Sequence, residues 1–347
     1  MLNIKYLTEM LENLRLENNI AGMSVAVTDG EKVLYNQGFG FENALRPDVP
    51  TYPEAMYKIA SMTKSVAAVM ILRLCEEGIL HLDTPIKTYI PWLTLSRPEA
   101  AETMTLRHLL THTSGLPTDA WLPEGSRDED TIERVARETL PTFPLGSTPG
   151  EGKYCYSNWG FSLAGCVASA VTGKTISQLL SEYVLTPLGM DRTTFDYYVA
   201  STWPLSLPHT ADGEGKFSVI HRQRVNTAYY AGGGLYSNTT DVCKLMRFFL
   251  NGGVTDSGKL LLSEASLQDM LSKHVVKDGN PGHYYGLGMF VRPFRDRYIY
   301  GHTGNYAPYN SSYFVDMKTG CGVTTMFNTQ VSDIRYHIPE MIFEMLD

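Results

Sequence analysis

The sequence predicts an α/β protein in which one sheet is built from both ends of the chain and a mostly helical subdomain is inserted between them. Strand-like runs gather near residues 22–39 and again after residue 285, whereas residues 80–208 carry short helical patterns interrupted by Pro and Gly. The 347 residues, 43% of them hydrophobic, suffice for one large domain or for two subdomains that share a core. We therefore expect an α/β subdomain of residues 1–79 and 215–347, a helical subdomain of residues 80–214, and a cleft between them that can hold a ligand.

The first elements of the chain are a helix, a hairpin and a second helix. Residues 4–18 place their apolar side chains on one helical face, and residues 22–28 and 32–39 are β-rich runs around Asp29-Gly30, a strong hairpin signal. The next helix is expected to run from Ser61 to near Gly78. Its apolar run over residues 66–72 has no polar stripe, so this helix should be buried on all sides.

The remaining elements follow from the same periodicities. Helical patterns occupy residues 105–111, 130–140, 158–171, 176–185, 240–250 and 334–346. Strand patterns occupy residues 285–291, 297–302, 311–315 and 322–327.

Composition limits the classes of function. A formal net charge of -8 argues against nucleic acid as the main partner. No apolar run reaches the roughly 18 residues of a membrane span, and the first residues do not resemble a signal peptide. The five cysteines are scattered without Cys-x-x-Cys, which is typical of reduced thiols. These observations predict a cytoplasmic protein without a membrane partner.

The tetrapeptide Ser61-Met62-Thr63-Lys64 at the start of the buried helix is the first candidate for chemistry. Residues three apart share a helix face, so a serine hydroxyl would lie at the positive end of a helix with an amine beside it. Burial of the amine favours its neutral form, which can accept a proton. A surface serine beside a solvated lysine is the alternative reading of the same four residues.

Two further motifs follow in order: Tyr156-Ser157-Asn158 before a helical run, and Gly301-His302-Thr303-Gly304 at the end of a strand run. With Ser-x-x-Lys, this ordered set resembles the serine-active penicillin-recognising family, which includes class C β-lactamases, DD-peptidases and related esterases and D-aminopeptidases. The resemblance extends to residues 105–116, 187–190 and 233–237 and so covers most of the chain. It implies the β-lactamase-like (DD-peptidase) fold, an antiparallel sheet flanked by helices with an inserted, mostly helical subdomain.

The resemblance also implies a role for each motif residue. Ser61 would attack a carbonyl and form an acyl-enzyme, while Lys64 and Tyr156 would share the removal of its proton. A phenol normally titrates near 10, so Tyr156 can act as a base only where positive charge stabilises its phenolate; which of the two groups is the base stays open. Asn158 would hold either the lysine or a substrate amide. The backbone N–H groups of Ser61 and Asn305 would receive the oxyanion.

The third motif has a competitor further along the chain. Lys318-Thr319-Gly320 copies the β-lactamase triplet literally, but it reads as a turn between two strands, whereas His302 ends one strand run and leads towards the next. We therefore predict that His302, Thr303 and Gly304 belong to the site, that His302 lines it, and that Lys318 does not. Histidine in place of lysine removes a fixed positive charge, since imidazole is mostly neutral at pH 7.

Three further features of the sequence give weaker indications of function. Relatives commonly have glycines at the positions of Asn305 and Pro308, and a proline should remodel the strand edge there. His108 and His112 have the spacing of metal ligands, but no third ligand is obvious and a structural role is preferred, so no metal is expected. Aromatic residues could line a substrate pocket or pack in the core with equal ease; they are Trp121, Tyr284, Tyr285, Tyr306 and Tyr309.

The sequence thus predicts a serine hydrolase that works through acyl-Ser61 without metal or organic cofactor. The absence of an export signal favours a small ester, or an amide of a D-amino acid or short peptide, as the small-molecule substrate. The alternatives are a class C-like β-lactamase or DD-carboxypeptidase, an acyltransferase using the same serine, and a non-catalytic binding or scaffold protein. The sequence makes no prediction of the oligomeric state.

Overall fold

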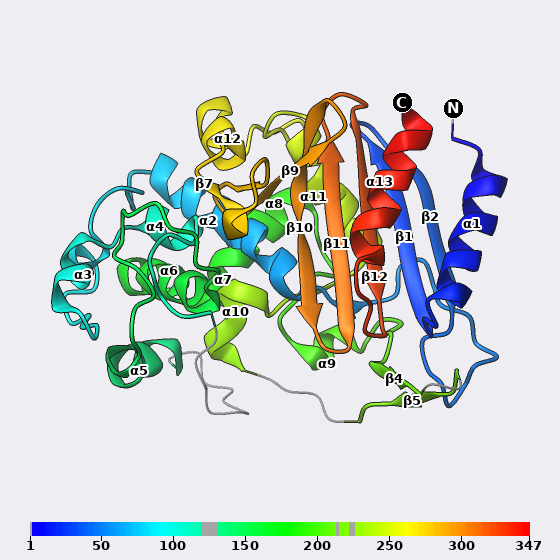
Figure 1. Cartoon of the computed structure of the whole chain (residues 1–347), viewed down its shortest axis with the longest axis horizontal. Helices are drawn as coiled ribbons and strands as arrows, with labels where there is room; N and C mark the ends of the chain where they lie inside the picture. Colours follow the sequence, from blue (N-terminus) through cyan, green and yellow to red (C-terminus); the bar gives the residue numbers. More distant parts are fainter. Residues whose placement is uncertain (1, 119–130, 213–214, 222–225) are drawn as a thin grey trace.

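An eight-stranded antiparallel sheet forms the centre of the structure, which is a computed structural model describing residues 2–118, 131–212, 215–221 and 226–347 (Figure 1). Across the sheet the strands are ordered β2 (Val33–Gly40), β1 (Gly22–Asp29), β12 (Cys321–Phe327), β11 (Tyr309–Asp316), β10 (Arg297–Tyr306), β9 (Phe290–Phe294), β8 (Tyr284–Tyr285) and β7 (Val275–Val276). The N-terminal hairpin joins the C-terminal strands through the β1–β12 pair, so the sheet is built from both ends of the chain as expected.

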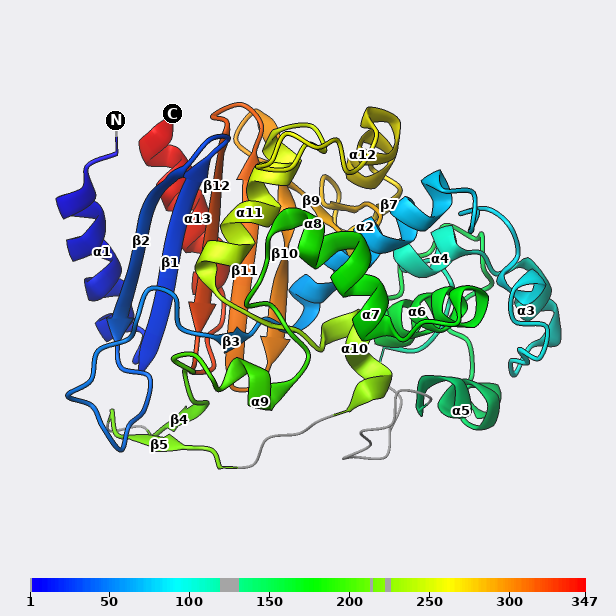
Figure 2. The ribbon, with the colours of Figure 1, turned by 180° about the vertical axis from the view of Figure 1, so that it is seen from behind.

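Helices cover both faces of the sheet. α1 (Ile4–Glu17) and α13 (Ile334–Leu346) lie on one face, and α11 (Thr239–Leu250) lies on the other, as Figures 1 and 2 show from opposite sides. A separate hydrophobic core fills each interface: Leu7 and Ile338 belong to the first, and Phe248 belongs to the second, larger one. Together the two cores give the three-layer arrangement expected when both faces of a sheet are apolar.

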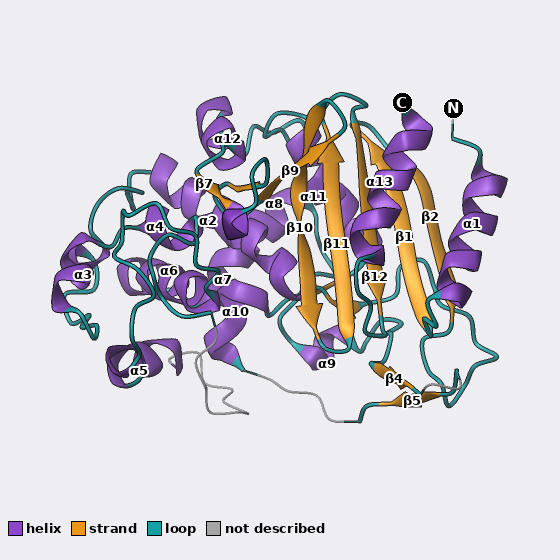
Figure 3. Cartoon of the chain, in the orientation of Figure 1, coloured by secondary structure: helices purple, strands orange, loops and turns teal. Residues whose placement is uncertain are grey.

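The segment between β2 and β7 is mostly helical, and apart from α11, which packs on the sheet face, most of its helices gather at the β7 side of the sheet (Figure 3). Its helices are α2 (Thr63–Glu76), α3 (Pro98–Thr103), α4 (Leu106–Leu110), α5 (Thr131–Glu138), α6 (Asn158–Thr172), α7 (Ile176–Leu180), α8 (Thr186–Leu188), α9 (Tyr197–Ala200), α10 (Tyr230–Gly233), α11 and α12 (Glu264–Leu271). Two small antiparallel pairs accompany them, β3 (Tyr57–Lys58) with β6 (Tyr236–Ser237) and β4 (His209–Ala211) with β5 (Phe217–Val219). The division into subdomains at residues 80 and 214 stays a prediction.

The helix α2 is buried on all sides, as the sequence predicts. Every residue from Thr63 to Leu72 is buried, and the helix packs between β10 and other helices of this segment, including α6 and α10. A three-residue 3₁₀ turn, η1 (Ala60–Met62), precedes it and carries Ser61. None of the helices within the described residues is long and apolar enough to cross a membrane.

Two expectations about the strands need correction. The strand expected over residues 285–291 is divided into β8 and β9, because Gly288 has φ +71 and breaks the extended run between them. Pro308 does not remodel a strand edge: it lies with Ala307 in the two-residue turn that joins β10 to β11, and the register continues to the Tyr306–Tyr309 pair. A turn needs no N–H from Pro308, so proline is tolerated there.

Candidate active site

The backbone that carries Ser61 is held in an uncommon conformation. Ala60 has φ +48, a region that non-glycine residues rarely adopt. The Thr63 hydroxyl donates to the Ala60 carbonyl at 2.7 Å, and the Ser311 hydroxyl of β11 donates to the Ile59 carbonyl at 2.9 Å. The Ile59 N–H donates to the carbonyl of Leu235 at 3.0 Å. The positive φ therefore persists because three separate segments hold the chain on either side of it, which is typical of functional sites.

Lys64 lies beneath Ser61 and is fully enclosed. Its side chain has no exposed surface, and its Nζ donates to the Ser61 Oγ at 3.1 Å, the Asn158 Oδ1 at 2.7 Å and the Gly232 carbonyl at 2.5 Å. The protonated amine can donate to all three acceptors, whereas the neutral amine donates to two of them and keeps a lone pair that can accept the Ser61 proton. The arrangement joins the starts of α2 and α6 to α10. The amine is therefore fixed within hydrogen-bonding distance of the serine hydroxyl.

Tyr156 and Asn158 come from the loop that enters α6. Ser157 caps this helix by accepting from the Gly160 N–H at 3.0 Å, and its own N–H donates to His112 Nδ1 at 3.1 Å. The Tyr156 ring lies 4.3 Å from the imidazole of His112 between centroids, and Lys64 Nζ lies 4.9 Å from its centroid. Hence Ser61 and Lys64 come together with Tyr156 and Asn158, which belong to a distant part of the sequence.

Strand β10 passes beside Ser61 through its Thr303-Gly304-Asn305 segment. A methyl group on Gly304 would clash with the Ile59 carbonyl oxygen and with the Ser311 Oγ, so the close approach of the strand to η1 requires glycine. Asn305 lines the same cavity as Ser61. The Thr303 side chain is instead buried, and its hydroxyl lies 3.3 Å from that of Tyr336 on α13.

His302 is buried behind this part of the strand. Only 1% of it is exposed; its ring stacks on Phe290 at 4.4 Å, and its Nε2 lies 2.9 Å from the Tyr285 hydroxyl. Nδ1 lies 2.6 Å from the Thr303 carbonyl, which can only accept, so Nδ1 carries the proton and Nε2 accepts from Tyr285. Burial, assisted by the charge of Lys64, lowers the pKa of His302 to about 3. The imidazole is therefore neutral.

The position of His302 differs in one respect from the expectation that it lines the site. The ring is enclosed by Tyr285 and Phe290 and is absent from the cavity lining, while Asn305 of the same strand reaches it. Lys318 lies on the turn between β11 and β12, as predicted, with its side chain 55% exposed and 3.4 Å from Asp296.

A cavity of about 280 Å³ opens at Ser61. Ser61, Asn158 and Asn305 contribute polar groups to it, together with the backbone of the Gly232–Gly234 segment. The aromatic residues that line it are Phe195, Tyr229, Tyr230, Tyr236 and Tyr306. Among the aromatic candidates from the sequence, Tyr306 therefore faces the cavity, whereas Tyr285 and Tyr309 are buried; Trp121 lies outside the described residues.

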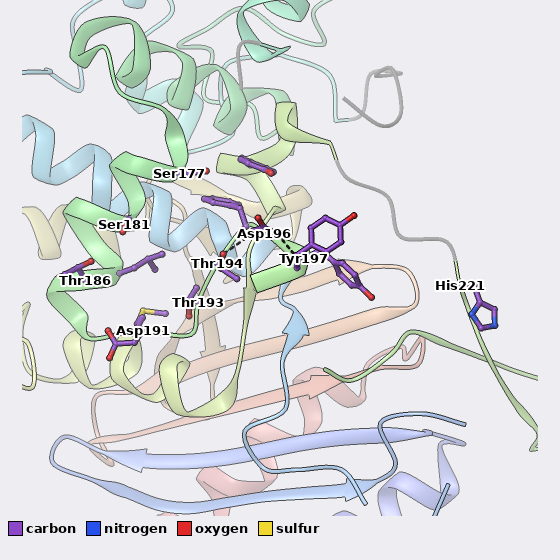
Figure 4. A pocket seen from close by; sticks show the side chains of 14 residues that line it. Ser177, Ser181, Thr186, Asp191, Thr193, Thr194, Asp196, Tyr197 and His221 are labelled. Atoms are coloured by element: carbon purple, nitrogen blue, oxygen red, sulfur yellow. Dashed lines mark hydrogen bonds between the residues drawn. The ribbon is translucent and has the colours of Figure 1, made fainter. Parts of the chain in front are cut away.

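A second, larger cavity lies on the other side of a stacked aromatic pair. Phe195 and Tyr230 stack at 4.3 Å between centroids and line both cavities. The second cavity, of about 780 Å³, is lined by hydroxyl and carboxylate side chains that include Ser181, Thr186 and Asp191 (Figure 4). It does not contain Ser61, so size alone does not identify the reactive site.

The two spaced histidines have structural roles. His108 Nδ1 accepts from the Thr105 N–H at 3.2 Å within the capping box of α4, and His112 supports the Tyr156 loop as described. Burial lowers the pKa of His112 well below its ordinary value. Among the described residues, no group of three or more His, Cys, Asp or Glu side chains is placed to hold a metal ion.

Several residues at the site are not foreseen from the sequence. They are Lys58, Thr63, His112, Gly232 and Ser311. Thr63 falls inside the Ser-x-x-Lys motif and Lys58 lies three residues before it, so proximity to the motif is the one signal that could have pointed to them. His112 lies within the 105–116 stretch of the resemblance, where its spacing indicated metal ligation or a structural role, whereas Gly232 and Ser311 come from distant segments and carry no motif of their own.

Comparison with known proteins places this arrangement in a family. A model of the β-lactamase family matches residues 6–341. The chain belongs to the β-lactamase family. This family is one of serine hydrolases, and both the fold and the family expected from the sequence are confirmed.

Individual relatives are distant. The "Protein flp" of Staphylococcus aureus (strain MW2) is 26% identical over 92% of this chain, and the match spans 62% of that longer relative. Among solved structures, the octameric penicillin-binding protein homologue from Pyrococcus abyssi is 25% identical with a TM-score of 0.84, covering 99% of this chain and 77% of the other. EstCE1, a hydrolase with promiscuous acyltransferase activity, is 20% identical with a TM-score of 0.82, covering 99% of this chain and 98% of the other.

Proposed function

We propose that this protein hydrolyses a small ester, or an amide of a D-amino acid or short peptide, through an acyl-enzyme on Ser61. The observation that carries the proposal is the contact of the buried Lys64 Nζ with the Ser61 Oγ at 3.1 Å, beside a cavity that Ser61 itself lines. A hydroxyl needs a neighbouring base to become a nucleophile, and an amine at hydrogen-bonding distance satisfies that need.

The reaction follows from this arrangement. The Ser61 proton passes to the Lys64–Tyr156 pair as Oγ attacks the carbonyl carbon, and the backbone N–H groups of Ser61 and Asn305 stabilise the oxyanion. The leaving alcohol or amine departs with a proton from the same pair. Water then attacks the acyl-Ser61 ester, which releases the acid and restores the serine. Asn158 keeps Lys64 in position by accepting from its Nζ.

The test is labelling and turnover with a matched pair of proteins. Wild type and Ser61→Ala are treated with a fluorophosphonate probe, and intact mass is measured; we expect one adduct on the wild type and none on the variant. A panel of 4-nitrophenyl esters, D- and L-aminoacyl anilides and nitrocefin then identifies the scissile bond. Failure of both labelling and turnover would instead favour the scaffold alternative.

The panel also separates the remaining alternatives. Faster turnover of nitrocefin than of esters and anilides would identify a β-lactamase. Release of an acylated alcohol in the presence of added alcohol, at the expense of free acid, would identify an acyltransferase, because both acceptors compete for the same acyl-enzyme.

A further inference from the structure

A buried lysine that forms no ion pair with any described residue lines the cavity at Ser61. Lys58 of β3 is 6% exposed, although it lies three residues before Ser61 and is one of the cavity-lining residues. Among the described residues, none forms a hydrogen bond or an ion pair with its Nζ. A buried ammonium is costly unless it is paired, so this charge needs an explanation.

The surroundings of Lys58 are aromatic. Its Nζ lies 4.2 Å from the ring centroid of Tyr306 on β10 and 5.2 Å from that of Tyr236 on β6. Cation–π contacts of this kind contribute about 0.5–2 kcal/mol, which offsets only part of the desolvation of an ammonium. The two rings hold the amine in place while leaving its hydrogen-bonding capacity unused.

A second unused donor lies beside it. Tyr236 lines the same cavity, is 2% exposed, and its buried hydroxyl has no hydrogen-bond partner within the part of the chain that the structure describes. Its backbone pairs with that of Lys58 in the β3–β6 ladder, so the two side chains originate from adjacent positions. Burial raises the pKa of Tyr236, which keeps the phenol protonated and able to donate. An ammonium and a hydroxyl, neither of them hydrogen-bonded to another described residue, therefore come from paired positions in the wall of the cavity.

The charge balance of the cavity favours an anion. Its described lining contains no Asp or Glu, and the three acceptors of the Lys64 Nζ named above are neutral groups. The other motif position at which a cation could have been supplied, His302, is neutral and enclosed. We propose that Lys58 and Tyr236 bind a carboxylate of the substrate, so the ester or amide cleaved at Ser61 carries an anionic group on its acyl or leaving side. This inference rests on the proposed function and assigns its substrate class.

The test uses two pairs of esters that differ in one negative charge. Mono-4-nitrophenyl glutarate is compared with its isosteric neutral partner 4-nitrophenyl 5-methylhexanoate, and 3-carboxy-4-nitrophenyl butyrate with 4-nitrophenyl butyrate. The readout is the ratio of kcat/KM for the charged and neutral members, which a general loss of folding leaves unchanged. Wild type should prefer the charged member of one pair by about 10- to 100-fold, the effect of a hydrogen bond to a charged group.

The variants assign that preference to the two residues. Lys58→Met should reduce the ratio to near that of the neutral esters, Tyr236→Phe should reduce it severalfold, and Lys58→Arg should retain most of it. Lys318→Met, which removes an exposed cation outside the cavity, is the matched control and should keep the wild-type ratio. Equal rates for charged and neutral members in both pairs, or a preference that survives in Lys58→Met, would overturn the inference while leaving the proposed hydrolysis intact.

A binding measurement covers the case in which no ester is hydrolysed. The Ser61→Ala protein is titrated calorimetrically with glutaric acid monoanilide against 5-methylhexananilide, and with 4-butyramidobenzoate against butyranilide. Tighter binding of one charged amide, lost in the Ser61→Ala/Lys58→Met double variant, supports the carboxylate site independently of turnover. Equal binding within both pairs overturns it.

Discussion

The two Thr-Gly triplets of this chain lie in contrasting surroundings. His302-Thr303-Gly304 runs along β10 beside the turn that carries Ser61, whereas Lys318-Thr319-Gly320 forms the exposed turn between β11 and β12. The literal copy of the β-lactamase triplet is therefore remote from the nucleophile, and the altered copy adjoins it. The two similar motifs differ in their chemical roles because the first packs against η1, whereas the lysine of the second pairs with an exposed acid, Asp296.

The cations of the two regions differ in the same way. Lys64 and Lys58 are buried at the Ser61 cavity, whereas Lys318 forms a 3.4 Å pair with Asp296 at the surface. Exposed pairs of this kind contribute about 0–1 kcal/mol and are easily replaced by water. Burial, rather than the presence of a lysine, thus separates the chemically important positions from the incidental one.

The largest contrast is expected from removing the amines. Lys64→Met should lower kcat/KM for a 4-nitrophenyl ester by about 10³-fold or more, because the serine loses the group that takes its proton. Lys318→Met should stay within about twofold of wild type. Steady-state kinetics on both variants, with circular dichroism to verify folding, measure the difference. A similar loss of kcat/KM in the two variants would show that Lys318 belongs to the active site.

The glycines of the two triplets provide the next contrast. Gly304→Ala would press a methyl group against the Ile59 carbonyl and displace η1, so we expect a loss of about 1–3 kcal/mol in stability and up to about 10²-fold in turnover. Gly320 has φ +65 and no neighbour that a methyl group would meet, so Gly320→Ala should cost about 1 kcal/mol with unchanged turnover. Urea unfolding measures the loss of stability in each variant, and ester hydrolysis measures whether the displacement also affects Ser61. Equal turnover in both variants would contradict the packing argument.

Because His302 is held neutral in the fold, we expect the stability of the protein to fall at acidic pH. The folded pKa of His302, about 3, lies below the ordinary 6.5, so between these pH values the unfolded chain binds a proton that the folded protein does not. The stability contribution of neutral His302 is present above pH 6.5 and is lost as the pH falls towards 3, by at most about 1.4 kcal/mol per pH unit.

The variant His302→Gln tests this point, since an amide oxygen can accept from Tyr285 but does not titrate in that range. The stabilities of wild type and variant should converge as urea unfolding is repeated at decreasing pH. Buried histidines that do not interact with His302, such as His209, contribute equally to both proteins and cancel. A difference that stays constant between pH 7 and 4 would show that His302 is not held neutral by the fold.

The smallest expected effect is the pH dependence of the preference for charged esters, which depends on Lys58. Burial lowers the pKa of this amine to about 8, with the phenols of Tyr236 and Tyr306 facing it. The kcat/KM preference of the free enzyme for a carboxylate-bearing ester should therefore decline as the pH rises through about 8. The ratio of charged to neutral ester, measured from pH 6 to 9.5, removes changes in the chemical step common to both. A ratio independent of pH would contradict this assignment.

Elements with strong periodicity were predicted well from the sequence. α13 coincides with its expected bounds, and α2 is as buried as its uniform apolar run indicates. Such helices can be predicted because the spacing of their own apolar side chains indicates which faces are buried. The pairing of β3 with β6 was not foreseen, since two-residue strands are too short to show a period.

The order of Ser-x-x-Lys, Tyr-x-Asn and His-Thr-Gly was sufficient to predict the family, the fold and the convergence of Ser61, Lys64, Tyr156 and Asn158. These are local patterns, and each records the chemistry of a side chain and the spacing of its near neighbours. Tertiary structure alone decided that Gly232 and Ser311 complete the nucleophile's surroundings and that His302 lies behind the cavity. It also decided that Lys58 lines the cavity with no ion pair to any described residue. The reason is physical: desolvation and the pairing of charges depend on which distant segments surround a group, and that information is not contained in its sequence neighbours.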